Sequence, residues 1–352
     1  MSHDALAAAK ATPQAFDPTP MPDSLAVCLT PYEQLVSGCN LESELRTHVT
    51  NHGRVGLVGA IGSGKSSVSR YALGAPELAM IALNVVTEDR KKIATVRGFL
   101  EILVSQLLSR ANSAGRITRK LREDLLADTT PTINPPRTEI LTRGELGGAF
   151  WLLRGGVAKQ VTRTLAGSES YRSTHDLRQA AREALAAITD SKLVPVLLAD
   201  DTDRLLRVAD NPEEAEQLFR GFFGEVLREI AEQLECGLIL AIHDSYLAHK
   251  DFQGFTTGRI VTKHIPRLTE SGQLAQIISR RAGFLAKPAH CEDLLTQDGL
   301  ERLTTIHCEG RDGELRATLS IFYQALALAC QDGSEQVEEH HIRAADTVSV
   351  SL

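Results

Sequence analysis

The sequence has no long hydrophobic run, no paired cysteine spacing and no excess of basic charge, and each absence excludes a class of protein. The longest apolar runs, at 193–199 and 236–242, are far shorter than the roughly 20 residues that span a bilayer. The first residues carry charges and lack the apolar core of a secretion signal. We therefore expect a cytoplasmic protein without membrane contacts.

The cysteines are scattered along the chain, and none forms a C-x-x-C pair. A large chain without a secretion signal has no use for a disulfide framework, and the spacing does not indicate metal ligands either. We expect six reduced thiols. They are Cys28, Cys39, Cys236, Cys291, Cys308 and Cys330.

The formal net charge of −7 argues against a surface that is basic throughout. One segment departs from this balance. Between Arg110 and Arg163, ten basic and five acidic residues give a net charge of +5, which leaves −12 for the rest of the chain. Such asymmetry is typical of a site for the phosphate backbone of duplex DNA, and it is equally typical of a solvated helix face.

The pattern of residues predicts an arm and two domains. Residues 1–24 are rich in Ala and Pro and predict a disordered or loosely attached arm. In 25–267, short apolar strands alternate with helices, which predicts a parallel sheet covered by helices, with an insertion at about 111–174. In 268–352 the pattern is helical only. The expected strands are 55–58, 79–86, 193–199, 237–242 and 259–265.

A glycine-rich segment after the first expected strand has the pattern G-x-x-x-x-G-K-[ST]. Its glycines let the backbone approach a phosphate, and its N–H groups and the N-terminus of the next helix face the anion. Lys65 neutralises the β- and γ-phosphates, and the Ser66 hydroxyl holds Mg²⁺. The strand–loop–helix context supports this P-loop over an ordinary glycine turn. The residues expected to bind nucleotide are Gly59, Ala60, Ile61, Gly62, Ser63, Gly64, Lys65, Ser66 and Ser67.

A second feature of P-loop enzymes is a carboxylate at the end of a neighbouring apolar strand. The strand 193–199 ends in Asp200 and Asp201. We expect Asp200 on the magnesium side and Asp201 at the attacking water, where many such ATPases carry glutamate. Aspartate is shorter by one methylene, so hydrolysis could be slow, or Glu88 at the end of the second expected strand could serve instead. Acidic caps of a strand-to-loop turn are the alternative interpretation.

The order of these motifs over roughly residues 30–347 resembles the AAA+ P-loop ATPases, and most closely the branch of origin-recognition initiators and transposition-regulating ATPases. It is also similar to bacterial STAND and KAP-type P-loop proteins. The resemblance implies an α/β parallel-sheet P-loop core of AAA+ type with a C-terminal all-helical lid domain. It also implies ATP rather than GTP as the nucleotide, Mg²⁺ as its ion, and assembly into a homo-oligomer.

The same resemblance assigns roles to residues in weaker motifs. His243 or Asp244, after the strand 237–242, stands where the family has its sensor-1 residue, or it caps the strand end. Arg259 stands where relatives carry an arginine finger, or it is a surface residue. Arg316, in Gly-Glu-Leu-Arg at 313–316, corresponds to the lid arginine called sensor 2, or it lies solvated on a helix.

Two uses of ATP are favoured from the sequence, and kinase activity on a small molecule is a further alternative, because small kinases share the same loop. The resemblance favours a DNA-associated regulator that couples nucleotide state to oligomerisation and holds duplex DNA through the basic insertion 110–163. The alternative is a STAND-type signalling or defence switch, whose output would pass through a partner protein. A motor that remodels proteins is disfavoured, because the segment 86–90 after the second strand is charged and lacks an aromatic pore loop.

Overall fold

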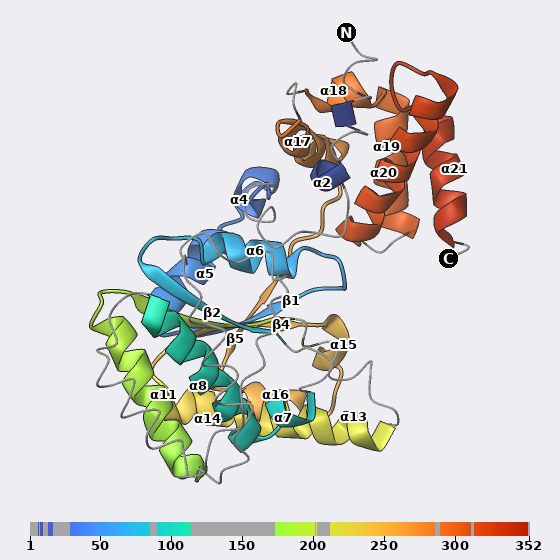
Figure 1. Ribbon diagram of the computed structural model, residues 1–352. Coiled ribbons are helices and arrows are strands. Elements are labelled where there is room, and N and C mark those ends of the chain that lie inside the picture. Colours follow the sequence, from blue (N-terminus) through green and yellow to red (C-terminus); the bar gives the residue numbers. More distant parts are fainter. Residues whose placement is uncertain are drawn as a thin grey trace, which may run out of the picture. The chain divides into compact units, whose positions relative to one another are not determined.

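The computed structural model describes residues 6, 8–9, 13–16, 29–84, 90–113, 173–200, 202, 212–285, 289–310 and 313–350 (Figure 1). The chain forms two compact units, and neither is one continuous segment. The sheet unit consists of Leu45–Leu57 and Leu73–Lys263. The lid unit consists of Met1–Glu44, Val58–Ala72 and His264–Leu352. The phosphate loop is therefore grouped with the lid unit rather than with the sheet unit.

The sheet unit is built on five strands: β1 (Arg54–Val58), β2 (Leu78–Asn84), β3 (Val194–Asp200), β4 (Gly237–Ile242) and β5 (Val261–His264). Their order in the sheet is β2-β3-β4-β1-β5, and β2, β3 and β4 run parallel. Pro195 is the second residue of β3, as a proline near a strand's beginning should be. The parallel sheet with covering helices confirms the predicted fold class.

Helices cover this sheet with their apolar faces. Helix α8 (Val96–Ser113) packs against α11 (Thr174–Thr189). In addition, α8 contacts β2 and α11 contacts β3. A longer helical stretch comprises α13 (Pro212–Phe219), the π-helical turn η1 (Arg220–Val226) and α14 (Leu227–Gln233). The strand β4 is buried at every position, as its unbroken apolar run predicts. The shorter helices of this unit are α7 (Arg90–Ile93), α15 (Asp244–Leu247) and α16 (Phe252–Thr256).

The lid unit is helical, as expected for 268–352. Its C-terminal part contains α17 (Ser271–Ala282), α18 (Cys291–Leu294), α19 (Gln297–Thr305), the π-helical turn η2 (Ile306–Gly310), α20 (Leu315–Asp332) and α21 (Glu339–Val350). The helices α4 (Tyr32–Leu35) and α6 (Lys65–Ala72) belong to the same unit, and α5 (Leu41–Thr50) begins in it. Within the described ranges, no helix is both long enough and apolar enough to cross a membrane.

Residues 13–16 of the expected N-terminal arm pack on helices of the lid unit. Residues Pro13–Phe16 form helix α2, which contacts α17 and α20. The Phe16 ring meets Phe322 edge to face, with 5.4 Å between ring centroids, and Arg281 Nη1 donates to the Ala15 carbonyl over 2.9 Å. The Ala- and Pro-rich composition concealed this attachment, in which Ala15 and Phe16 are both buried.

We predict that Phe16→Ala destabilises the protein by about 3–5 kcal/mol, because a fully buried aromatic side chain is lost and leaves a cavity. Thermal or denaturant unfolding of the full chain measures this change. The matched control is Phe284→Ala in the same unit, where the ring is 40% exposed and a change below about 1 kcal/mol is expected. Equal effects of the two substitutions would contradict the packing of α2 on the lid.

Candidate nucleotide site

The segment between β1 and α6 has the backbone geometry of a phosphate-binding loop. Gly62 and Gly64 have φ values of +72° and +97°, in the left-handed region that side chains other than glycine rarely adopt. The loop leads directly into the N-terminus of α6, whose first N–H groups have no partners within the helix. Loop and helix together form a cradle of amide donors, which suits an anion such as a nucleotide phosphate.

The Lys65 side chain folds over this cradle. Its Nζ atom donates to the carbonyls of Gly59 and Ala60, over 2.6 and 2.7 Å. The Ser63 hydroxyl is buried and, within the described residues, has no hydrogen-bond partner. A buried polar atom without a partner costs free energy, so a ligand that accepts or donates there would be favoured. These residues fit the triphosphate and its ion, with Ser66 as the first side chain inside the helix after Lys65.

The lid helix α20 begins against the same loop. The Arg316 amide donates to the Gly62 carbonyl over 3.1 Å. A Cβ atom at Gly62 would lie 2.7 Å from Glu314 Cγ and 2.8 Å from Arg316 Cβ, so a side chain there would collide with α20. The structure thus brings Arg316 next to the loop. Its side chain is exposed and its guanidinium has no hydrogen-bond or ion-pair partner among the described residues.

The start of α20 is held in place by a buried histidine. His307, in η2, has its Nδ1 atom 2.7 Å from Thr318 Oγ1 in the first turns of α20. The amide of Gly313 donates to the His307 carbonyl over 2.9 Å. Burial lowers the pKa of His307, so its ring is neutral near pH 7. This anchor fixes the position of α20 relative to the turn that precedes Arg316.

A tyrosine from the N-terminal part of the chain supports the loop from another side. The Tyr32 hydroxyl donates to the Ser63 carbonyl over 3.0 Å, and a Cβ at Gly64 would lie 3.7 Å from that hydroxyl. The Tyr32 amide in turn donates to Glu42 Oε1 over 2.7 Å. Burial, reinforced by the charge of Glu42, raises the pKa of Tyr32, so the hydroxyl stays a donor. Sequence reasoning did not identify this residue, because no motif marks a single tyrosine.

The acidic strand end lies in the sheet unit. Asp200 is the last residue of β3, is buried, and pairs in register with Asn84 at the end of β2. Thr202 follows it and donates from Oγ1 to the Ala241 carbonyl on β4, and the Tyr246 hydroxyl donates to the Thr202 carbonyl over 2.6 Å. Thr202, two residues after Asp200, is therefore held by contacts with β4 and with Tyr246. Asp201 lies outside the described residues, and its role stays a prediction.

Two further predicted residues have identifiable positions in the sheet unit. His243 follows β4, which lies between β3 and β1, and it caps α15 by accepting the Ser245 amide at Nδ1 over 3.1 Å. Asp244 beside it is exposed. Capping was the alternative interpretation for this strand end. His243 does cap α15, and it also follows a strand that lies between β3 and β1, the two strands that carry the main motifs. Contact of either residue with nucleotide stays a prediction.

Arg259 interacts with its own unit. Its Nη1 atom donates to the Phe255 carbonyl over 2.7 Å, and Nη2 lies 3.7 Å from Glu232 Oε1. A role as a finger in a neighbouring subunit would require the guanidinium to leave these partners, and that role stays a prediction. Most of the basic insertion 110–163 lies outside the described residues, and so does the contact with DNA that it was expected to make.

Comparison with known proteins places the fold. No known protein family matches the sequence, and no curated protein matches it. The structure is similar to the ORC2 protein of Aeropyrum pernix in its ADP form, with a TM-score of 0.51 and 13% identity over 95% of this chain and 71% of that one. The structure of ORC2 in its ADPNP–ADP complexes gives a TM-score of 0.51 and 14% identity, over 96% of this chain and 71% of that one.

A third similar structure is Cdc6p from Pyrobaculum aerophilum, with a TM-score of 0.45 and 14% identity over 96% of this chain and 71% of that one. The chain thus shares the fold of the ORC2 structures, a parallel sheet with covering helices and a helical C-terminal part, as the motif order predicted. At this level of identity the similarity concerns the fold alone. The roles of individual residues rest on the geometry described above.

We predict that Tyr32→Phe weakens ADP binding about three- to tenfold, because it removes one hydrogen bond, worth about 0.5–1.5 kcal/mol, from the Ser63 carbonyl of the loop. Isothermal titration calorimetry measures the affinity, and circular dichroism checks that the fold is intact. Tyr71→Phe, in α6, is the matched control and should bind ADP as the unaltered protein does. Unchanged affinity in Tyr32→Phe would show that the hydroxyl does not support the loop.

Proposed function

We propose that the chain is a Mg²⁺-dependent AAA+ ATPase that couples its nucleotide state to oligomerisation and acts as a DNA-associated regulator. In this proposal Gly59–Ser67 bind the phosphates, and Ser66 and Asp200 hold the magnesium ion. Lys65 neutralises the phosphates, and Asp201 orients the attacking water. The bound Mg²⁺ supplies charge neutralisation at the transferring phosphate.

The observation that carries the proposal is the hydrogen bond from the Arg316 amide to the Gly62 carbonyl. It places a cationic side chain, unpaired among the described residues, at the start of a lid helix beside the phosphate loop. An arginine in this position can bind the γ-phosphate, which ADP lacks, and the lid then responds to the state of the nucleotide. Binding of ADP and ADPNP by the structurally similar ORC2 protein supports the choice of an adenine nucleotide.

Oligomerisation and DNA enter the proposal through two other features. Arg259 is the candidate for reaching the nucleotide of a neighbouring subunit, as arginine fingers do when supplied in trans. The insertion 110–163 carries the charge of +5 that would contact phosphates of duplex DNA. A STAND-type switch that works through a partner protein would use the same nucleotide site but would need neither of these features.

We predict that Lys65→Ala abolishes ATP hydrolysis and that Arg316→Ala lowers kcat at least about tenfold, because a charge beside the transferring phosphate is lost. Steady-state phosphate release measures both. The matched control is Arg343→Ala, an exposed arginine on α21 of the same unit, which should hydrolyse ATP at the unaltered rate. Full turnover by Arg316→Ala would remove the proposed coupling between lid and loop.

The oligomer is tested by measuring turnover per subunit across protein concentration, with and without duplex DNA. We expect turnover to rise with concentration and to rise further with DNA. Arg259→Ala should remove the concentration dependence without weakening ATP binding. If turnover is indifferent to both variables while Lys65→Ala is inactive, the ATPase stands and the switch with a partner protein replaces the DNA-associated regulator.

We also predict that DNA binding depends on salt through the insertion. Replacing Arg119, Lys120 and Arg122 together by alanine should reduce the slope of log K against log salt by up to about 3, since each phosphate contact contributes roughly 0.9. Fluorescence anisotropy of a labelled duplex measures the slope, with Arg343→Ala as the control. Absence of binding even at low salt would exclude DNA as the partner.

A further inference from the structure

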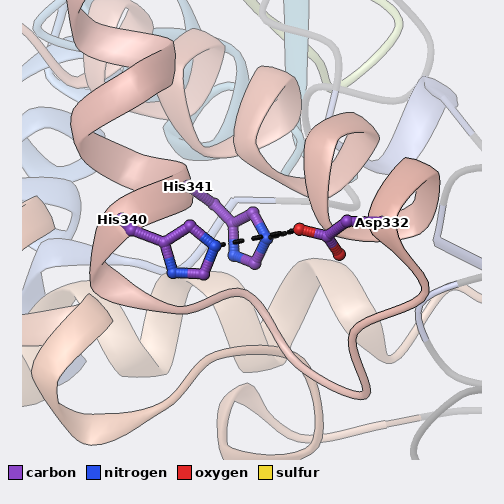
Figure 2. Close-up of side chains that lie close together, drawn as sticks. All are labelled: Asp332, His340 and His341. Atoms are coloured by element: carbon purple, nitrogen blue, oxygen red, sulfur yellow. Dashed lines mark hydrogen bonds and ion pairs between the residues drawn. The ribbon is translucent and has the colours of Figure 1, made fainter.

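Three metal-ligating side chains lie together at the junction of α20 and α21 in the lid unit. Asp332 is the last residue of α20, and His340 and His341 lie in the first turn of α21 (Figure 2). Within the described ranges, this is the one group of at least three His, Cys, Asp or Glu side chains whose ligand atoms all lie within 4.8 Å of one another. The proposed ATPase function makes no use of it.

Both imidazoles face the same carboxylate oxygen. His341 Nε2 lies 2.6 Å from Asp332 Oδ2, and His340 Nε2 lies 3.8 Å from the same atom. Figure 2 shows the two rings side by side and both directed at Asp332. Their centroids lie 3.8 Å apart. One histidine suffices for a structural His–Asp pair. A second imidazole aimed at the same oxygen gives the donor set of a transition-metal site.

The carboxylate is held in place. The Ser334 hydroxyl and amide donate to Asp332 Oδ1 over 2.7 and 3.0 Å, which leaves Oδ2 for the histidines. Oδ2 is therefore directed at two nitrogen donors.

The cluster is accessible from solvent. The side chains of His340 and Asp332 are 63% and 47% exposed, whereas His341 is 2% exposed. The three residues form part of the wall of a depression of about 330 Å³. It is lined by Leu328, Gln331, Asp332, His340, His341 and Ala344. An ion can therefore reach Asp332 and His340 directly from solvent.

We infer that Asp332, His340 and His341 bind a divalent transition metal ion, with Zn²⁺ as the ion that best suits two imidazoles and one carboxylate. Tetrahedral zinc with bonds of about 2.0–2.2 Å requires about 3.4 Å between ligand atoms. The His341–Asp332 distance must lengthen and the His340–Asp332 distance must shorten, each by less than about 1 Å. The exposed His340 side chain can turn to achieve this.

Metal binding at His341 would have a local structural consequence. The Glu338 amide donates to His341 Nδ1 over 2.9 Å, so the proton of the neutral ring is on Nε2, where it points at Asp332. A metal ion on Nε2 moves that proton to Nδ1, where it faces the Glu338 amide and breaks this cap of α21. Because the lost cap costs free energy, we expect a site of moderate affinity. Because the proton moves to Nδ1, we expect a detectable change of tautomer at His341.

The experiment is a titration of the EDTA-treated, dialysed full chain with ZnCl₂, without nucleotide, followed by calorimetry. We expect one ion per chain and at least about a tenfold loss of affinity in His340→Ala and in Asp332→Asn. Both positions are exposed, so the variants should fold, and circular dichroism verifies this. The matched control is His175→Ala, an exposed histidine on α11, which should bind zinc as the unaltered protein does.

Two spectroscopic readouts separate this site from the cysteines. Co²⁺ bound at the cluster should give a visible spectrum without the thiolate charge-transfer band that cysteine ligation produces. In ¹⁵N NMR spectra, zinc should convert His341 from the Nε2-protonated to the Nδ1-protonated tautomer. The inference is overturned if no zinc binds, if His340→Ala retains full affinity, or if the cobalt spectrum shows thiolate ligands.

Discussion

The hydrogen bond between the Arg316 amide and the Gly62 carbonyl is the contact on which the proposed chemistry depends. It connects two backbones directly, so no flexible side chain separates the lid helix from the phosphate loop. It is formed because residue 62 has no side chain, since a Cβ atom would lie 2.7 Å from Glu314. Any movement of α20 must therefore be accompanied by movement of the loop or by loss of this bond.

The main elements of the fold and the individual motifs could be predicted from the sequence. The run 193–199 corresponds to β3, and the run 237–242 corresponds to β4, because a strand buried on both faces is apolar throughout. The glycine and lysine positions of the loop follow from the chemistry of phosphate binding. These signals are local, and each can be recognised within about ten residues.

The supporting residues could not be predicted, because their partners are far away in the sequence. Tyr32 contacts a loop residue 31 positions later, and Tyr246 contacts a carbonyl 44 positions earlier. A lone tyrosine in a sequence does not indicate its partner. The attachment of Phe16 was missed for the same reason, since its partner Phe322 lies far away in α20 and the surrounding composition is typical of an unattached arm.

The lid unit consists of three separate segments of the chain, and this affects the order in which the protein folds. Gln273 bonds to the Leu35 carbonyl across 238 residues, and Arg281 bonds to Ala15 across 266. Contacts this distant are slow to form, because the entropy of closing such loops must be overcome first. During synthesis, most of the sheet unit leaves the ribosome before the C-terminal helices exist. The phosphate loop, grouped with those helices, would be among the last parts of the protein to reach its final environment.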